Sequence, residues 1–333
     1  MAIIENKSTA GFRLQSESSS SGKSGIALPA GSWDTHVHVF DSTIGPFASS
    51  RSYTPAQANL RQLLDFSSTL TGNQPLNIVL VQPSPYRNDN TVLLHLLRKL
   101  RDDGAKSARG VAVVDIDNTG DEELWSMHQL GVRGLRINMQ ADGKSTDVAA
   151  LRSVLERTAS RIRTLPGWRI QLFCAAAIWD ELFETIYNLP VEVIADHVGG
   201  LYGSSKLPSK SDSSVVDCTK QPGFASLVRL AKDSKVIIKV SGLYRLSSQT
   251  DTGYDDMEPI IKTLADAVPD RLVWGSDWPH TGEGHDRLKR GRNAIEEFRE
   301  IDDKSILLNL REWVGSADAW EKMTLINPRK LYG

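Results

Sequence analysis

Eight short apolar segments recur along the chain, and each is followed by a stretch long enough for a helix. They are rich in valine, isoleucine and leucine, and they span residues 32–40, 76–82, 109–115, 131–138, 168–173, 191–197, 235–241 and 271–277. Strands that are apolar on both faces belong to a parallel sheet covered by helices, because a sheet with one face in water shows alternation instead. No G-x-G-x-x-G turn follows an early strand, which disfavours a Rossmann-type fold. The pattern predicts a single α/β domain, a (β/α)8 barrel of the TIM type.

The barrel is expected to occupy residues 31–333, since α/β barrels routinely hold this many residues in one domain. Residues 1–30 contain a serine-rich polar tract that buries too little apolar surface to order itself, so we expect a disordered leader there. Residues 199–223 are rich in glycine, serine and lysine and are longer than a usual connection. They are predicted to form an active-site loop or a mobile insertion.

The composition argues against several classes of partner. The formal net charge of -2 gives no basic excess of the kind that binds nucleic acid or an anionic membrane surface. No apolar run approaches the roughly 18 residues of a membrane span, and the N-terminus lacks the apolar core of a secretory signal, so a cytoplasmic location is expected. Cys174 and Cys218 are too few for a disulfide framework and lack C-x-x-C spacing. The sequence leaves the oligomeric state open.

Two histidines on the first predicted strand are the leading candidates for a functional site. Successive side chains on a strand point to opposite faces, so His36 and His38 share one face. The last apolar segment stops at an acidic residue, Asp277, just before a proline turn. Catalytic groups of a (β/α)8 barrel lie at the C-terminal ends of its strands. The fold therefore predicts that the two histidines and this carboxylate meet.

Polar residues also follow most of the other apolar segments. In chain order they are Gln82, Ser84, Asp115, Arg136, Asn138, His197, Ser241 and Arg245. We expect them at the same end of the barrel, because all the strands run in one direction. Tyr53, in the first long loop, is a candidate to cap the site. His280, just beyond the last strand, is a candidate substrate contact, with a structural role in its loop as the alternative.

Several of these segments together resemble the amidohydrolase-related (amidohydrolase 2) family. Within that family the likeness is greatest to 2-pyrone-4,6-dicarboxylate lactonases and related lactone hydrolases. The resemblance extends from about residue 32 to the end of the chain. Its motifs are Asp34-Thr35-His36-Val37-His38 and the segments 110–115, 131–138, 196–199, 239–245 and 274–280.

The resemblance implies an amidohydrolase-like, distorted barrel that hydrolyses a small carboxylated lactone of the pyrone or muconolactone type. Asp277 would be the general base on water, and the imidazoles would polarise the lactone carbonyl or hold one metal ion; these are His36, His38 and His197. Arginines would bind substrate carboxylates, with further polar contacts around them; these residues are Arg136, Arg245, Ser84, Tyr53 and His280. The chemistry agrees, since a carboxylate accepts a proton from water and guanidinium groups bind carboxylates in a bidentate way.

One departure from the family bears on metal binding. Many amidohydrolases carry a histidine or a carboxylated lysine on strands four and five, but here those strands end in residues 136–138 and 170–174. A binuclear centre is therefore not expected. One divalent ion, with zinc as the expected metal, could be held by His36, His38, His197 and Asp277. The pyrone-dicarboxylate lactonases that the chain resembles are thought to need no metal, so we expect one metal ion or none, and no organic cofactor.

Two other functions remain open. Related barrels include metal-dependent decarboxylases of aromatic or unsaturated acids, although such an enzyme would normally show the extra metal ligand that this sequence lacks. A non-catalytic barrel is disfavoured, because a binding protein has no need for three histidines together with Asp277. In each case the expected partner is a small carboxylated molecule.

Overall fold

The computed structural model describes residues 28–105, 107–139, 147–208, 216–284 and 287–333. Most of the predicted leader, residues 1–27, and residues 209–215 of the predicted insertion lie outside this part. The described end of the leader belongs to the packed structure. Leu28 is buried, and its backbone N–H donates to the carbonyl oxygen of Leu70 at 2.9 Å.

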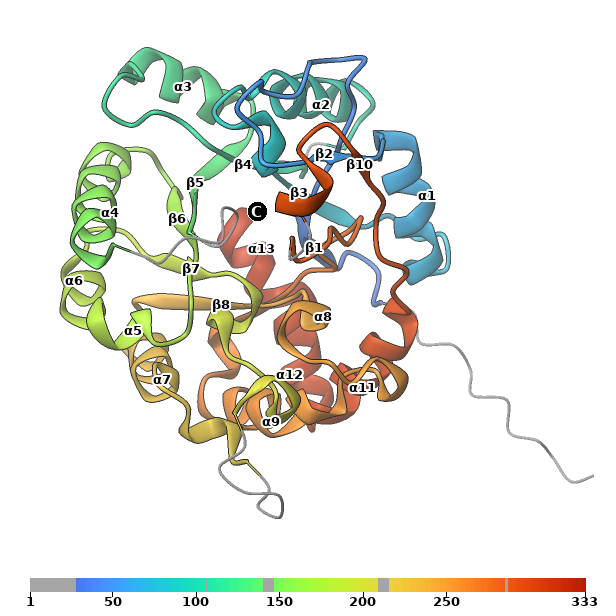
Figure 1. Ribbon diagram of the computed structural model, residues 1–333, viewed down its shortest axis with the longest axis vertical. Coiled ribbons are helices and arrows are strands. Elements are labelled where there is room, and N and C mark those ends of the chain that lie inside the picture. Colours follow the sequence, from blue (N-terminus) through green and yellow to red (C-terminus); the bar gives the residue numbers. More distant parts are fainter. Residues whose placement is uncertain (1–27, 106, 140–146, 209–215, 285–286) are drawn as a thin grey trace, which may run out of the picture.

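The eight apolar segments all contain a strand, and the strands form one parallel sheet in chain order (Figure 1). The strands are β1 (Trp33–Val37), β3 (Asn77–Val81), β4 (Arg109–Ala112), β5 (Val132–Asn138), β6 (Arg169–Phe173), β7 (Val193–Ala195), β8 (Val236–Val240) and β9 (Leu272–Trp274). The sheet closes between its first strand and the segment after its last. Asp277 N–H donates to the His36 carbonyl oxygen at 2.9 Å, and His38 N–H donates to that of Trp278 at 2.8 Å. The predicted (β/α)8 barrel is confirmed.

Alternate residues of the strands contribute to two separate parts of the core. On β3, Val79 belongs to a small cluster inside the barrel, whereas Ile78 belongs to the large cluster between strands and helices. The inner cluster is completed by α13 (Asn327–Tyr332), whose Tyr332 ring stacks on Trp33 with 6.0 Å between centroids. Both faces of each strand are thus buried, which explains why the strands are apolar throughout.

Helices surround the barrel and connect its strands (Figure 1). The first of them, α1, is capped at Asn59, whose side chain and that of Gln62 bond reciprocally to backbone N–H groups, and it ends at Gly72 with φ 60°. No helix in the described ranges combines the length and apolar character that crossing a membrane requires. The helices other than α13 are α1 (Leu60–Thr71), α2 (Thr91–Asp102), α3 (Asp121–Gln129), α4 (Val148–Ile162), α5 (Ile178–Glu181), α6 (Phe183–Asn188), α7 (Phe224–Lys232), α8 (Leu243–Leu246), α9 (Glu258–Ala267), α10 (Arg287–Arg290), α11 (Asp303–Trp313) and α12 (Ala317–Glu321).

A second, two-stranded sheet links the loop after β1 to the segment after β9. It pairs β2 (Thr54–Pro55) with β10 (Ile295–Glu296) in parallel. Next to it, the guanidinium carbon of Arg287 lies 3.7 Å from the centroid of the Tyr53 ring. This small sheet therefore fixes the position of Tyr53.

Candidate functional site

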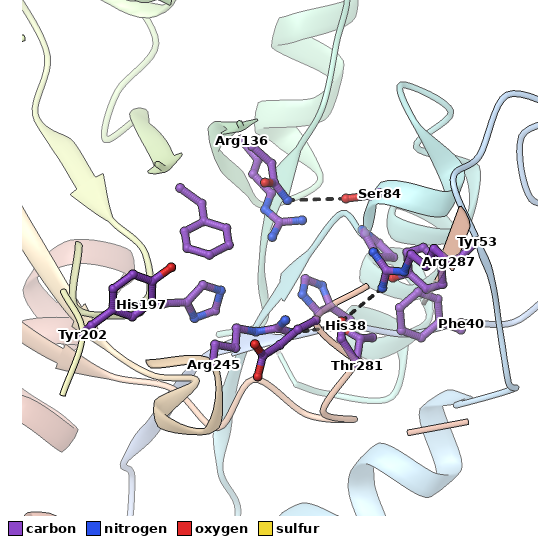
Figure 2. A pocket seen from close by; sticks show the side chains of 15 residues that line it. His38, Phe40, Tyr53, Ser84, Arg136, His197, Tyr202, Arg245, Thr281 and Arg287 are labelled. Atoms are coloured by element: carbon purple, nitrogen blue, oxygen red, sulfur yellow. Dashed lines mark hydrogen bonds between the residues drawn. The ribbon is translucent and has the colours of Figure 1, made fainter. Parts of the chain in front are cut away.

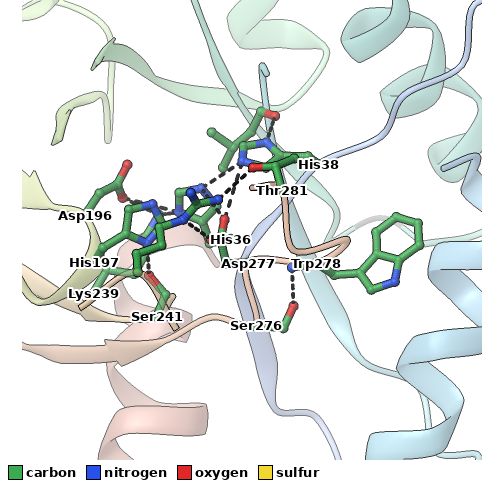
Figure 3. A network of polar contacts seen from close by, with 12 residues as sticks. His36, His38, Asp196, His197, Lys239, Ser241, Ser276, Asp277, Trp278 and Thr281 are labelled. Carbon is green, nitrogen blue, oxygen red and sulfur yellow. Dashed lines mark hydrogen bonds and ion pairs between the residues drawn. The ribbon is translucent and has the colours of Figure 1, made fainter. Parts of the chain in front are cut away.

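The polar residues at the C-terminal ends of β1 and β9 form a buried cluster (Figure 3). His36 and His38 point the same way, and their Nε2 atoms are 3.2 Å apart. Oδ1 of Asp277 lies 3.6 Å from both of these nitrogens. The closed barrel thus brings two imidazoles and a carboxylate from opposite ends of the chain to one point.

The carboxylate of Asp277 has one occupied oxygen and one open oxygen. Oδ2 accepts hydrogen bonds from the Tyr244 hydroxyl at 2.6 Å and from Nε of Arg245 at 2.7 Å. Oδ1 is buried and accepts no hydrogen bond from the described part of the chain. Burial raises the pKa of a carboxyl group, but Arg245 and the nearby imidazoles outweigh it and hold the pKa of Asp277 well below its usual range. Asp277 is therefore ionised, with its open oxygen facing His36 and His38.

The third imidazole, His197, lies directly after β7 and is also neutral. Burial lowers the pKa of His197 to about 3. Its Nδ1 is 3.0 Å from Oγ of Ser241, and its ring packs edge-on against Phe173 with 4.6 Å between centroids. The backbone of His197 has φ 49° and that of Asp277 has φ 64°, a region that side-chain-bearing residues rarely adopt. Such strain is concentrated at functional sites in many proteins.

A charged pair that the sequence analysis did not single out lies next to the histidines. Lys239 Nζ donates to Oε1 of Gln171 at 2.8 Å and is 3.3 Å from Oδ1 of Asp196, and both charged residues are fully buried. Burial would raise the pKa of Asp196, but Lys239 and His36 outweigh it, so the pKa is far below its usual range. The available signal was a lysine inside the apolar run Val-Ile-Ile-Lys-Val of β8.

Three donor atoms are placed to hold one divalent ion, namely Nε2 of His36, Nε2 of His38 and Oδ1 of Asp277. Their separations of 3.2, 3.6 and 3.6 Å are close to the roughly 3.4 Å expected between tetrahedral zinc ligands with bonds of about 2.1 Å. The open, buried Oδ1 also suits a cation. The cluster can therefore hold a metal ion. His197, the fourth expected ligand, instead groups with His36 and Asp196.

A cavity of about 170 Å³ opens beside the cluster (Figure 2). Two guanidinium groups reach it from different elements. Arg136, on β5, donates from Nη1 to the Gln82 carbonyl oxygen at 3.2 Å, and its buried Nε bonds to no described residue. Arg245, on α8, donates from Nη2 to the hydroxyl of Thr281 at 2.7 Å. The other lining residues include His38, His197, Tyr53, Ser84, Tyr202 and Arg287.

Two residues expected at the site lie elsewhere. His280 is not among the described residues that line the cavity; its Nε2 is 2.9 Å from Oδ2 of Asp303, and its ring packs edge-on against Tyr244 at 5.5 Å between centroids. Asp115 is exposed and accepts a hydrogen bond from the side chain of Asn118 at 2.7 Å. The reason is that β4 ends at Ala112, before the predicted segment does.

Comparison with known proteins adds relatives of similar length. A 2-pyrone-4,6-dicarboxylate hydrolase of Comamonas testosteroni is 30% identical over 315 residues, which cover 92% of this chain and 91% of the relative. A 4-sulfomuconolactone hydrolase of Hydrogenophaga intermedia is 28% identical over 310 residues, covering 92% and 90%. A crystal structure from Pseudomonas putida, provisionally named a 2-pyrone-4,6-dicarboxylic acid hydrolase, superposes with a TM-score of 0.67 at 28% identity, covering 92% and 98%.

The family itself follows from a match that spans the whole barrel. The family model described as amidohydrolase matches residues 33–333, from the first residue of β1 to the end of the chain. The fold, the histidine pair of β1 and the carboxylate after β9 all lie within this match. The chain belongs to the amidohydrolase family.

Proposed function

We propose that this protein is a hydrolase that opens a small carboxylated lactone. The observation that carries the proposal is the open Oδ1 of Asp277, which is ionised, buried and next to a cationic cavity. A carboxylate in this position can accept a proton from water. Relatives named as hydrolases of 4-sulfomuconolactone and of 2-pyrone-4,6-dicarboxylate support a lactone as the substrate class.

In the proposed reaction Asp277 is the general base. Oδ1 removes a proton from a water molecule as the water oxygen attacks the carbonyl carbon of the lactone. The ring C–O bond then breaks, the proton passes to the ring oxygen, and the product carries a new carboxylate and a hydroxyl group. The bonds from Tyr244 and Arg245 to Oδ2 keep Oδ1 directed at the reacting water.

The imidazoles and arginines would position the substrate. With Ser241 donating to Nδ1 of His197, Nε2 of that ring carries a hydrogen that can bond the carbonyl oxygen. Arg136 and Arg245 reach the cavity from separate elements and suit carboxylate groups, which planar guanidinium binds in a bidentate way. A divalent ion, with zinc as the expected metal, held by His36, His38 and Asp277 would supply further positive charge next to the carbonyl. We also keep the expectation of a cytoplasmic enzyme without a nucleic-acid partner.

The test is turnover of a panel of carboxylated lactones by wild-type protein, Asp277→Asn and Asp115→Asn, each with and without a chelator. The amide at position 277 cannot accept the proton, so the first variant should lose about 10²- to 10⁴-fold in kcat. Asp115→Asn is the matched control, because this exposed carboxylate lies away from the cluster, and it should keep wild-type activity.

Three outcomes would contradict the proposal. One is that Asp277→Asn retains more than a few per cent of activity. Another is release of carbon dioxide from an unsaturated acid without lactone opening, which would indicate the metal-dependent decarboxylase. The third is lactone binding without turnover by the wild-type protein, which would indicate a non-catalytic barrel.

A further inference from the structure

The buried ammonium group of Lys239 takes no part in the proposed hydrolysis. It is fully buried on β8, and besides Gln171 and Asp196 it has a third neighbour, Nδ1 of His36, at 3.4 Å. Taking a charge out of water costs several kcal/mol unless the charge is well paired. The contact with His36 indicates a role for this lysine in the cluster.

The partners of the two histidines fix where their hydrogens lie. The carbonyl oxygen of Val81 can only accept, so Nδ1 of His38, 2.8 Å away, carries a hydrogen. Burial lowers the pKa of both His36 and His38, so both are neutral, and Nε2 of His38 is an acceptor. Nε2 of His36 lies 3.2 Å from it and must carry the hydrogen between them. Nδ1 of His36 is then bare and accepts from Lys239.

The hydrogen bonds therefore run in one direction, from Lys239 through His36 and His38 to Val81. The opposite tautomer of His36 would need Asp196 as its acceptor. Oδ1 of Asp196 is 3.3 Å from Nδ1, but it makes no hydrogen bond to any described residue. The geometry favours donation by Lys239.

Metal binding needs the other tautomer. To ligate an ion through Nε2, His36 must carry its hydrogen on Nδ1, where it would face the Lys239 ammonium. Both groups would then be donors at 3.4 Å, and the ammonium would add a positive charge close to the ion.

We propose that Lys239 selects the tautomer of His36 and thereby weakens the binding of divalent metal ions by the cluster of His36, His38 and Asp277. Lys239 is a positioning residue, since it acts on the cluster through His36. The inference does not rest on the identity of the substrate.

The first measurement uses the wild-type chain after chelation. Nitrogen NMR of ¹⁵N-histidine-labelled protein distinguishes a protonated from a bare ring nitrogen, and a His36→Gln variant assigns the signals. We expect His36 with hydrogen on Nε2 and a bare Nδ1. A hydrogen on Nδ1 of His36 in the metal-free wild-type protein would overturn the proposal without any lysine variant.

The second measurement is the zinc affinity of Lys239→Met by equilibrium dialysis. Lys232→Met is the matched control, because Lys232 is exposed on α7. Changes in the partners of metal-ligating histidines typically alter affinity about 10- to 100-fold, so Lys239→Met should bind zinc at least tenfold more tightly than the wild type and the control. A smaller gain, or a loss, would overturn the proposal. Neither measurement uses a lactone, so their failure is distinct from failure of the proposed hydrolysis.

Discussion

Gly242 lies between the proposed base and the third histidine, and Gly242→Ala tests how tightly the site is held. A Cβ atom at this position would be 2.6 Å from Nδ1 of His197 and 3.1 Å from Oδ2 of Asp277. Ordinary contact begins at 3.4 Å, so the imidazole must move by about 0.8 Å. A misplacement of about 1 Å in an active site can cost about 10²-fold in rate. We therefore expect kcat/KM to fall about 100-fold.

Gly72→Ala is the matched control for this variant. Gly72 and Gly242 have nearly the same left-handed backbone, with φ 60° and 59°, but nothing lies within 4 Å of a Cβ added at Gly72. Both alanines pay about 1–2 kcal/mol for the left-handed conformation. Only Gly242→Ala adds the overpacking cost of about 1–3 kcal/mol, so its free energy of unfolding should be lower than that of Gly72→Ala by this amount.

Urea unfolding and initial rates on a lactone that the wild type opens measure the two effects. Loss of activity should be confined to Gly242→Ala, whereas both variants should lose stability. If the kcat/KM values of the two variants agree within tenfold, the proposed coupling between the positions of His197 and Asp277 and the reaction is wrong.

Two further predictions concern the cavity and acid stability. Arg136→Met should raise KM for a carboxylated lactone about 10- to 100-fold with less change in kcat, because it removes a charged hydrogen-bond donor; an unchanged KM would refute carboxylate binding by this residue. Burial lowers the pKa of His36, His38 and His197, so below pH 6.5 the unfolded chain binds more protons than the folded one, and stability present above that pH is lost as the pH falls towards the folded values, about 3 for His197. In urea titrations with chelator, His197→Phe should lower the slope of this loss by up to about 1.4 kcal/mol per pH unit, and an unchanged slope would contradict the assignment.

The strands were predictable because the barrel buries both of their faces. Each strand is a continuous apolar run, and such runs stand out from the helical segments between them. Where a run ends was less predictable. The segment 109–115 stays apolar as far as Val114, but its ladder with the neighbouring strands stops at Ala112, so Asp115 is exposed.

The meeting of His36, His38 and Asp277 follows from topology, since all C-terminal strand ends of a closed parallel barrel lie together. The contact between Lys239 and Asp196 does not follow in this way. It depends on the register between β7 and β8 and on the direction that the chain takes after β7, and neither is encoded in hydrophobic periodicity. The direction of His280 depends on its own backbone, whose φ of 68° turns the side chain towards Asp303.

The same hydrogen bonds close the barrel and set the geometry of the site. The backbone of Asp277 bonds to that of His36, and the backbone of His38 bonds to that of Trp278, so each bond across the seam involves a residue of the cluster. Nearby, the hydroxyl of Thr35 donates to the carbonyl oxygen of Trp274 at 2.7 Å. Because the two ends of the barrel sequence meet only here, the separation of the imidazoles from the carboxylate is fixed by closure of the sheet rather than by a flexible loop. This explains how one carboxylate oxygen can stay buried and open while its partner oxygen is held by Tyr244 and Arg245.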